Sequence, residues 1–362
     1  MAEIQDNVWM AHALQLAARG LNTTSPNPRV GCVLVREGRN VGEGWHVRTG
    51  EPHAEAHALQ AAGSAARGAT AYVTLEPCSH HGRTPPCADA LVAAGVRRVV
   101  VAVQDPNPQV AGEGLARLHA AGVEVECGLM ESAARELNVG FFSRMTRGRP
   151  WVRSKVGMSL DGRTALANGA SKWITGTSAR EDVQRWRARS CAVLTGSGTV
   201  LADDPALNVR AFPCERQPLR AVLDSTLQMP TWARLLQTPG VMIYSALADA
   251  GKIAALERAG AQVRVMANPQ GQVDLSDVLA DLAGHGINEV LVEAGSTLNG
   301  ALLQAGLVDE MLLYVAPQLL GDGARGIAQL GEMIALDQRI EMGWQDIRQV
   351  GDDLRILARV KG

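Results

Sequence analysis

The residues best suited to chemistry are one histidine and two cysteines in the first half of the chain. His53 opens the triplet HAE, Cys78 ends the triplet EPC, and Cys87 follows a pair of prolines. A catalytic zinc takes three protein ligands and leaves one position open, and a neutral imidazole with two thiolates binds it well. The pattern therefore predicts one zinc ion per chain, held by His53, Cys78 and Cys87.

Glu55 lies two residues after the first of these ligands, where it suits an acid and base better than a fourth ligand. In zinc deaminases a glutamate takes a proton from the attacking water and passes it to the leaving amine. Zinc lowers the pKa of that water from about 16 to about 7. We therefore predict hydrolytic loss of ammonia from an amidine-like carbon. The alternatives are a zinc that only staples a loop, or two buried thiols without metal, but structural zinc sites usually have four Cys or His ligands.

Hydrophobic periodicity in the first half predicts an α/β sheet that positions these residues. The expected helices span 6–19, 54–62, 88–94, 114–121 and 132–138, and the expected strands span 31–35, 41–45, 71–75, 97–103 and 123–127. This alternation is typical of a largely parallel sheet with helices on both faces. It places His53 in the first turn of a helix and Cys78 at the C-terminal end of a strand, the edge where open α/β sheets carry active sites.

A second domain is expected after the segment 143–151, which has three Arg, one Gly and one Pro between a helical end and a new apolar run. The boundary is predicted near 147–149, with a first domain at 1–147 and a second at 148–362. The second domain also alternates strands and helices, and it closes in a hairpin that turns near 351–353. Its expected strands span 151–160, 192–196, 220–224, 241–245, 262–266, 289–295 and 311–320, and its expected helices span 178–190, 253–260, 275–283 and 296–305.

Length and composition limit the class of function. The chain has 362 residues, of which 46% are hydrophobic, enough for two cores. Residues 1–148 carry 13 Arg, no Lys and 14 acids, and residues 149–362 carry 22 bases and 23 acids, so neither half resembles a nucleic-acid binder. The longest apolar run, 311–316, is far short of the roughly 20 residues that cross a membrane. Six scattered cysteines and no basic leader before an apolar stretch favour a cytoplasmic protein with reduced thiols.

Glycine-rich turns are the chemical signal of the second half, although the dinucleotide fingerprint GxGxxG is absent. The segments 195–199 (TGSGT) and 293–300 (EAGSTLNG) lead from strands into helices, where backbone amides can approach a pyrophosphate. Composition and spacing alone indicate only an α/β domain. On that interpretation Arg187 belongs to a solvated helix face, Trp173 to the core and Asp203 to a turn before a proline.

Several motifs taken together resemble one known family. Zinc deaminases generally carry PCxxC, but here eight residues separate the two thiols in CSHHGRTPPC (78–87), which resembles the deaminase of riboflavin biosynthesis. The motifs SPNPRVG and DPNP agree with that family, and four motifs of the second half are similar to the reductase domain of the same pathway. These four are KVGMSLDGR (155–163), WITG (173–176), DDPALNVR (203–210) and VEAG (292–295). The chain thus resembles the bifunctional riboflavin deaminase-reductases over nearly its whole length.

This resemblance implies a cytidine-deaminase-like α/β/α domain followed by a dihydrofolate-reductase-like α/β domain. It implies zinc-dependent deamination of 2,5-diamino-6-(5-phosphoribosylamino)pyrimidin-4(3H)-one, a small pyrimidine ribosyl phosphate. The ribosyl group of the product, 5-amino-6-(5-phosphoribosylamino)uracil, is then reduced to ribityl with NADPH. On matching positions, the residues expected to contact the first substrate are Asn27, His46, Ala54, His80, Arg83, Asp105 and Asn107.

For the reduction, the resemblance implies substrate contacts from Ser171, Arg187, Leu207, Arg210 and Glu293. The residues expected to hold NADPH are Gly157, Trp173, Thr199, Asp203, Ser225, Gly295, Ser296, Thr297, Leu298, Asn299, Gly300 and Ala301. Lys155 is the expected catalytic or substrate-orienting cation. Arg187 or Arg210 suits the 5′-phosphate, because a guanidinium forks onto phosphate oxygens.

Two other functions are weighed against this one. A deaminase of nucleosides or RNA bases predicts a basic, aromatic surface, whereas aromatic residues make up only 4% of the chain. Alternatively, the second half is a non-catalytic module that binds a nucleotide or flavin, or that only dimerises. The resemblance also implies a homo-oligomer, a dimer or larger, without nucleic-acid or membrane partners. No residue identifies a clamp that selects NADPH over NADH.

Overall fold

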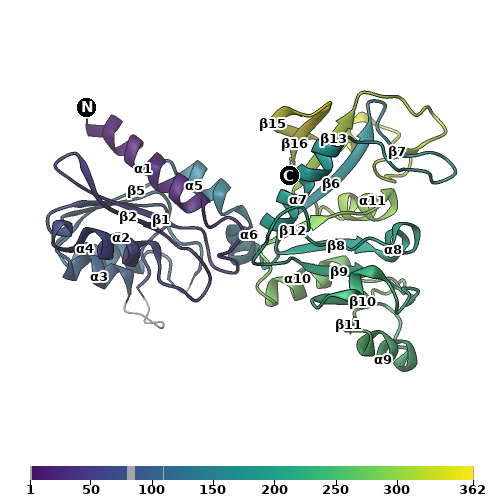
Figure 1. Cartoon of the computed structure of the whole chain (residues 1–362), viewed down its shortest axis with the longest axis horizontal. Helices are drawn as coiled ribbons and strands as arrows, with labels where there is room; N and C mark the ends of the chain where they lie inside the picture. Colours follow the sequence, from purple (N-terminus) through teal and green to yellow (C-terminus); the bar gives the residue numbers. More distant parts are fainter. Residues whose placement is uncertain (1, 80–85, 109, 362) are drawn as a thin grey trace. The chain divides into compact units, whose positions relative to one another are not determined.

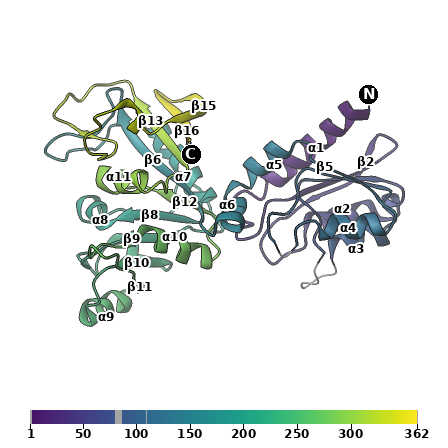
Figure 2. The same cartoon turned by 180° about the vertical axis from the view of Figure 1, so that it is seen from behind.

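The computed structural model describes residues 2–79, 86–108 and 110–361, and the chain folds as two compact units, 1–149 and 150–362. Each unit is an α/β domain built on its own sheet (Figures 1 and 2). Among the described residues, no helix combines the length and the apolar character needed to cross a membrane. Each unit is described by itself below.

The first unit has a five-stranded sheet in the order β2-β1-β3-β4-β5. The strands are β1 (Gly31–Arg36), β2 (Arg39–Trp45), β3 (Thr70–Val73), β4 (Arg98–Val101) and β5 (Glu124–Cys127). The expectation of a largely parallel sheet is right for β3, β4 and β5 but wrong for β1, which is antiparallel to both β2 and β3. The short turn between β1 and β2 makes that pair antiparallel, because a tight hairpin can join only antiparallel strands; the pairing of β1 with β3 is non-local.

Helices cover both faces of this sheet, as expected (Figure 1). They are α1 (Ala2–Ala18), α2 (Ala54–Ala62), α3 (Cys87–Ala93), α4 (Glu113–Ala120), α5 (Glu131–Leu137) and α6 (Val139–Arg147). The apolar faces of α1, α5 and α6 form one core with the sheet, and those of α2, α3 and α4 form another. The sheet is therefore buried on both faces, so a site that binds a substrate is expected near the ends of its strands.

Glycines let two helices approach this sheet closely. A Cβ on Gly31 of β1 would lie 2.0 Å from the carbonyl oxygen of Ala13 in α1. A Cβ on Gly44 of β2 would lie 2.7 Å from the carbonyl oxygen of Ala54, the first residue of α2. Backbone atoms cannot yield as a flexible side chain can, so only glycine fits at these positions. The contact with β2 fixes the start of α2, which carries the first predicted zinc ligand.

The second unit is built on a nine-stranded sheet in the order β11-β10-β9-β8-β12-β6-β13-β16-β15. These strands are β6 (Trp151–Ser159), β8 (Ala192–Gly196), β9 (Leu219–Leu223), β10 (Val241–Ser245), β11 (Ala261–Val265), β12 (Glu289–Val292), β13 (Glu310–Ala316), β15 (Met342–Val350) and β16 (Asp353–Val360). In this order the first seven strands, from β11 across to β13, are parallel to one another. The hairpin of β15 and β16 adds two antiparallel strands beside β13.

Helices again cover both faces of the larger sheet. They are α7 (Thr177–Arg189), α8 (Ser197–Asp203), α9 (Ala250–Arg258), α10 (Leu275–Gly284) and α11 (Ser296–Gln304). Helices α10 and α11 pack on one face, and α7, α8 and α9 pack on the other. The sequence did not predict α8, nor the short pair β7 (Arg163–Ala165) and β14 (Arg325–Gly326), because these segments are short and lack a clear apolar period.

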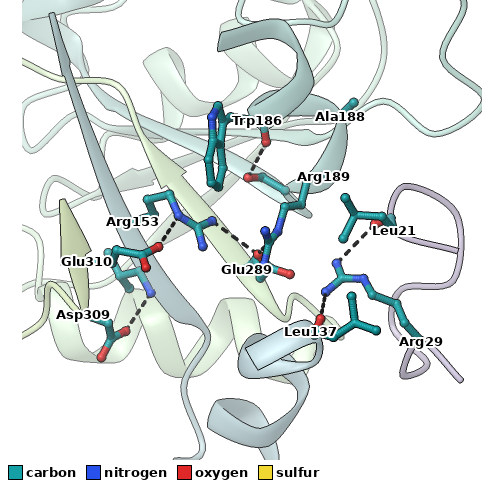
Figure 3. Close-up of polar contacts among 12 residues, drawn as sticks. Leu21, Arg29, Leu137, Arg153, Trp186, Ala188, Arg189, Glu289, Asp309 and Glu310 are labelled. Carbon is teal, nitrogen blue, oxygen red and sulfur yellow. Dashed lines mark hydrogen bonds and ion pairs between the residues drawn. The ribbon is translucent and has the colours of Figure 1, made fainter. Parts of the chain in front are cut away.

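A buried group of charges joins the first residues of three parallel strands in the second unit (Figure 3). The guanidinium of Arg153 in β6 donates to Glu310 of β13 at 2.5 Å and to Glu289 of β12 at 3.3 Å. Its carbon lies 4.6 Å from the ring centre of Trp186 in α7. Arg189 donates to the same Glu289 at 2.9 Å, so each buried carboxylate has a cation beside it. The group lies at the strand ends opposite the cleft described below, and loss of either carboxylate would leave buried positive charge without full compensation.

We expect the Gly44→Ala substitution to displace the start of α2. Its added methyl group meets backbone, and overpacking of this kind costs about 1–3 kcal/mol of stability. Thermal unfolding should show a lower midpoint, and zinc retained after dialysis against a chelator should fall. Gly284→Ala is the matched control, because no atom lies within 4 Å of the added Cβ. An unchanged midpoint and unchanged zinc content in Gly44→Ala would contradict the proposed close packing.

Candidate active sites

The three predicted zinc ligands come together in the first unit. The Nδ1 atom of His53 lies 3.6 Å from the Sγ atom of Cys78 and 3.4 Å from that of Cys87, and the ligand atoms all lie within 4.8 Å of one another. His53 precedes the first residue of α2, Cys87 begins α3, and Cys78 lies in the segment after β3. One imidazole and two thiols at these separations fit a tetrahedral zinc with one open position.

Glu55 lies beside these ligands in the first turn of α2, with only 3% of its surface exposed. Burial raises the pKa of its carboxyl to about 7, and the neighbouring Cys78 thiol adds to the effect, although His53 opposes it. A carboxyl with a pKa near the working pH both accepts and releases a proton readily. The arrangement therefore suits general acid and base chemistry.

Two further predicted residues, His46 and Asn27, form a polar pair next to the ligands. The rings of His46 and His53 have their centres 5.5 Å apart and are nearly perpendicular. Burial lowers the pKa of His46. Its Nδ1 atom lies 3.1 Å from the carbonyl oxygen of Pro52, so Nδ1 carries the proton and Nε2 accepts from the amide of Asn27 at 3.2 Å. This pairing fixes the orientation of the Asn27 side chain.

Buried polar contacts also hold the segment that carries Asn27. The guanidinium of Arg29 donates to the carbonyl oxygens of Leu137 at 2.7 Å and Leu21 at 3.2 Å (Figure 3). The side chain of Asn138 exchanges two hydrogen bonds with the backbone of Arg29. No local pattern indicates this role for Asn138, because its partner lies 109 residues away.

The remaining predicted residues of the first site have different outcomes. Ala54 is fully buried at the start of α2, beside the ligands. Asp105 and Asn107 lie in the loop between β4 and α4, where Asp105 accepts a hydrogen bond from the backbone of Asn107 at 2.8 Å. His80 and Arg83 fall outside the described residues. Sequence reasoning missed Glu76, a buried carboxylate that binds this same loop and that stands in the EPC motif itself.

A large cleft of about 1580 Å³ opens in the second unit, at the C-terminal ends of β6, β8, β9 and β12. Small-molecule pockets are typically 300–1,000 Å³, so this cleft has room for two ligands. It brings together sixteen residues predicted for the second site. These are Lys155, Gly157, Ser171, Trp173, Arg187, Thr199, Asp203, Leu207, Arg210, Ser225, Glu293, Gly295, Ser296, Thr297, Leu298 and Ala301.

A buried carboxylate organises the cations in this cleft. Arg187 donates to both oxygens of Glu293, at 2.6 and 3.0 Å, and Lys155 lies 3.3 Å from one of them. Burial raises the pKa of Glu293, but Arg187 and Lys155 outweigh burial and bring it down to about 2. The guanidinium of Arg187 also donates to the carbonyl oxygen of Asn208 at 3.0 Å. Arg187 is therefore engaged by protein groups, on a face of α7 that is buried and not solvated.

Other charged groups lie around the mouth of the cleft. Arg210 is largely exposed, and its partial desolvation, then the positive charges of Arg187 and Arg234, lower its pKa. Sequence reasoning missed Arg234, which lines the same cleft and lies in no recognised motif. Asp203 forms an ion pair with Lys172 at 3.0 Å. Trp173 is 70% exposed and lies under the guanidinium of Arg180, so the alternative that it belongs to the core is wrong.

The glycine-rich turn after β12 presents the start of α11 to the cleft. Gly295 precedes that helix and has no side chain to cap it, and the first N–H groups of a helix suit an anion. Two residues of the run 295–301, which is predicted to hold a cofactor, are not among those that line the cleft. Asn299 is buried and donates to the carbonyl oxygen of Ile327 at 3.1 Å, and a Cβ on Gly300 would lie 2.1 Å from the backbone of Gln329. Both lie on the side of α11 that faces protein.

Comparisons with known proteins agree with both sites. Residues 3–103 match the family model described as the cytidine and deoxycytidylate deaminase zinc-binding region, and residues 150–356 match the RibD C-terminal domain. The riboflavin biosynthesis protein RibD of Escherichia coli K12 is 52% identical over 365 residues, which cover 97% of this chain and 98% of that one. The chain belongs to the RibD family. It is a bifunctional deaminase and reductase of riboflavin biosynthesis, with a zinc-binding deaminase domain.

Solved RibD structures extend this agreement to the fold. RibD of Acinetobacter baumannii is 46% identical, with a TM-score of 0.91 and full coverage of both chains. A Thermotoga maritima protein described as a diaminohydroxyphosphoribosylaminopyrimidine deaminase and 5-amino-6-(5-phosphoribosylamino)uracil reductase is 31% identical, with a TM-score of 0.89 and full coverage of both chains. The predicted fold class and bifunctional activity are confirmed. The alternative of a non-catalytic second half is not favoured.

The depressed pKa of Glu293 predicts a pH-dependent contribution to stability. The folded chain holds this pKa at about 2, below its ordinary value of 4.5. The contribution is therefore complete above about pH 5 and is lost as the pH falls toward 2, and it amounts to roughly 3 kcal/mol. Urea unfolding of the wild type and Glu293→Gln, followed by tryptophan fluorescence, should give stabilities that differ most near pH 7 and converge below pH 3.

Glu257→Gln is the matched control for this measurement, because Glu257 is an exposed carboxylate on α9. Its stability curve should follow that of the wild type at every pH. If the free energies of unfolding of the wild type and Glu293→Gln differed by the same amount from pH 7 to pH 2, the lowered pKa of Glu293 would be contradicted.

Proposed function

We propose that the first site deaminates 2,5-diamino-6-(5-phosphoribosylamino)pyrimidin-4(3H)-one, and that the second reduces the ribosyl group of the aminouracil product. The observation that carries the first step is the cluster of His53, Cys78 and Cys87 beside the buried Glu55. The name of the Thermotoga relative, which covers the full chain, supports these two substrates. Together they form two successive steps on one phosphorylated pyrimidine.

In the deamination, the protein supplies the ligands and the proton carrier. Zinc at the three ligands supplies the Lewis acidity that makes a water molecule nucleophilic near neutral pH. Glu55 takes a proton from the attacking water and returns it to the amine that leaves as ammonia. The fixed amide of Asn27 and the backbone at Ala54 orient the pyrimidine ring, with His46 holding Asn27 in place. Asp105 and Asn107 contact the same substrate from the β4–α4 loop, and His80 and Arg83 are proposed contacts from the family resemblance.

In the reduction, the protein positions two ligands in one cleft. The residues that line the cleft would hold NADPH, which would supply a hydride for C1′ of the ribosyl group, while the ring oxygen would take up a proton from solvent as the sugar opens to ribityl. The uncapped start of α11 suits the pyrophosphate, and the cofactor contacts are proposed at the predicted residues that line the cleft, without Asn299 and Gly300. Lys155, held by Glu293, orients the ribosyl oxygens.

The contacts of the two arginines separate their proposed roles in the second site. Arg187 is bound to both oxygens of Glu293, so we assign it to positioning this carboxylate. Arg210 is exposed in the cleft, and it is therefore the better partner for the 5′-phosphate. Ser171 and Leu207 complete the proposed substrate contacts, from the segments that precede α7 and follow α8.

Two reciprocal variants test whether the sites act independently. Glu55→Gln should lower ammonia release by about 10²–10⁴-fold, because the proton carrier is lost, while sparing the reduction of supplied aminouracil. Arg210→Ala should raise the KM for the aminouracil by about 10–100-fold, because a charge-assisted contact is lost, and should leave ammonia release near normal. Ammonia assays and NADPH absorbance measure the two steps.

Arg258→Ala is the control for the loss of an exposed arginine in the second unit, and both steps should survive in it. Zinc content, expected at one ion per chain, is measured on every variant. Loss of both activities in folded Glu55→Gln would overturn the independence of the sites. Ammonia release without NADPH oxidation in the wild type would overturn the reductase assignment.

A homodimer that pairs through β15 is the proposed assembly. This strand is the edge of the nine-stranded sheet, and it leaves Trp344 and Ile347 67% and 55% exposed. Exposed apolar edge strands are typically covered, because their free backbone groups and side chains favour pairing. Native mass spectrometry at working concentration should give twice the chain mass or a larger multiple, and a monomer would refute the proposal.

We also place the enzyme in the cytoplasm. All six cysteines are free thiols, and zinc takes Cys78 and Cys87 as thiolates. A reducing compartment keeps such thiols available.

A further inference from the structure

Glu76, which the deamination mechanism does not use, is the most heavily hydrogen-bonded carboxylate of the first site. Its side chain is buried, with 5% of its surface exposed. One oxygen accepts from the backbone N–H groups of Gly114 at 2.8 Å and Leu115 at 3.3 Å. The other accepts from the N–H groups of Asp105 at 3.1 Å and Gly112 at 3.0 Å. Four backbone donors therefore converge on one carboxylate.

These donors belong to two features that need an outside partner. Gly114 and Leu115 lie in the first turn of α4, whose N–H groups have no partner within the helix. The residue that precedes α4 is Gly112, which has no side chain to cap it. Glu76 fills this capping role from the segment after β3, and its negative charge suits the positive end of the helix.

Close packing at the same place supports this role independently. A Cβ on Gly114 would lie 2.0 Å from the carbonyl oxygen of Pro77, the residue between Glu76 and the ligand Cys78. The start of α4 thus lies against the backbone of the EPC segment. Because backbone meets backbone there, the two segments have little freedom to shift.

A continuous set of hydrogen bonds leads from Glu76 to the proposed substrate contacts. Glu76 accepts from the backbone of Asp105, and the Asp105 carboxylate accepts from the backbone of Asn107 at 2.8 Å. The carbonyl oxygen of Asn107 in turn accepts from the N–H groups of Val110 and Ala111, both at 3.0 Å. The position of Asn107 therefore depends on the anchor at Glu76.

We propose that Glu76 is a positioning residue that holds the β4–α4 loop, and with it Asp105 and Asn107, in the geometry that binds the pyrimidine ribosyl phosphate. This inference rests on the proposed substrate contacts of the loop. Glu76 acts through the loop and touches no reacting atom. Its removal therefore affects substrate binding more than turnover, and it leaves zinc in place.

Glu76→Gln is the decisive variant. A glutamine has the same length but only one acceptor oxygen, and its NH₂ group would face backbone donors where the second oxygen stood. We expect the KM for the deaminase substrate to rise about tenfold or more, with kcat reduced much less. Amide hydrogen exchange in peptides that cover 102–118 should increase. Zinc content and the reduction of supplied aminouracil should match the wild type.

Glu113→Gln is the matched control, since it removes one negative charge from the same segment at an exposed position. Its carboxylate accepts from the hydroxyl of Ser79 at 3.3 Å, and no described backbone N–H of the loop donates to it. Both KM and hydrogen exchange should stay within about twofold of the wild type. Asn107→Ala separately tests the proposed contact on which the inference rests. A raised KM in Asn107→Ala with normal KM in Glu76→Gln would overturn the role of Glu76 alone.

Three further outcomes would count against the inference. Unchanged hydrogen exchange in Glu76→Gln would show that the loop does not depend on this carboxylate. Faster hydrogen exchange in Glu76→Gln with an unchanged KM would show that Glu76 holds the loop but that substrate binding does not depend on it. Loss of zinc together with activity would show that Glu76 acts on Cys78 instead of on the loop.

Discussion

A carboxylate removed from water must be compensated by the protein, and both sites of this chain depend on how that constraint is met. Among the described residues no arginine or lysine acts on Glu55, and burial raises its pKa to about 7, which suits the proposed proton carrier. Glu293 has two cations beside it, and its pKa falls to about 2, which keeps it a permanent anion. Glu76 is surrounded by four backbone donors and serves as an anchor. Three buried glutamates are thus suited to three different roles, and the groups that surround each carboxylate decide which.

The two sheets bring the partners of these buried glutamates close to them. In the second unit, Lys155 lies on β6, Glu293 follows β12, and Arg187 reaches them from α7, so neighbouring parallel strands bring their C-terminal ends to one cleft. In the first unit, the ligands come from the starts of α2 and α3 and from the segment after β3. Close packing of α2 on the glycines of β2 fixes the first of these. Each unit supplies the described residues of one proposed site.

The accuracy of the sequence predictions followed the range of the interactions involved. Helices such as α2 and short apolar strands such as β8 were predicted closely, because the local sequence pattern indicates them. The antiparallel pairing of β1 with β3 and the short helix α8 were not, because strand pairing is non-local and a seven-residue helix has little period. The run 295–301 was taken as one motif, yet the helical turn of α11 points Asn299 and Gly300 away from the cleft. The chemistry of the site residues themselves stays a prediction until the variants are measured.

The sequence by itself determined which chemical groups this protein has and their order: an imidazole and two thiols with a glutamate beside them, then a second α/β domain with glycine-rich turns. Those properties are local, since residue type and spacing decide what can bind a metal or an anion. Only the tertiary structure decided the protonation tendencies of Glu55 and Glu293, the engagement of Arg187 by a carboxylate, and the convergence of four amides on Glu76. These depend on burial and on distant partners such as Arg187 and Glu293, 106 residues apart, which packing alone brings together.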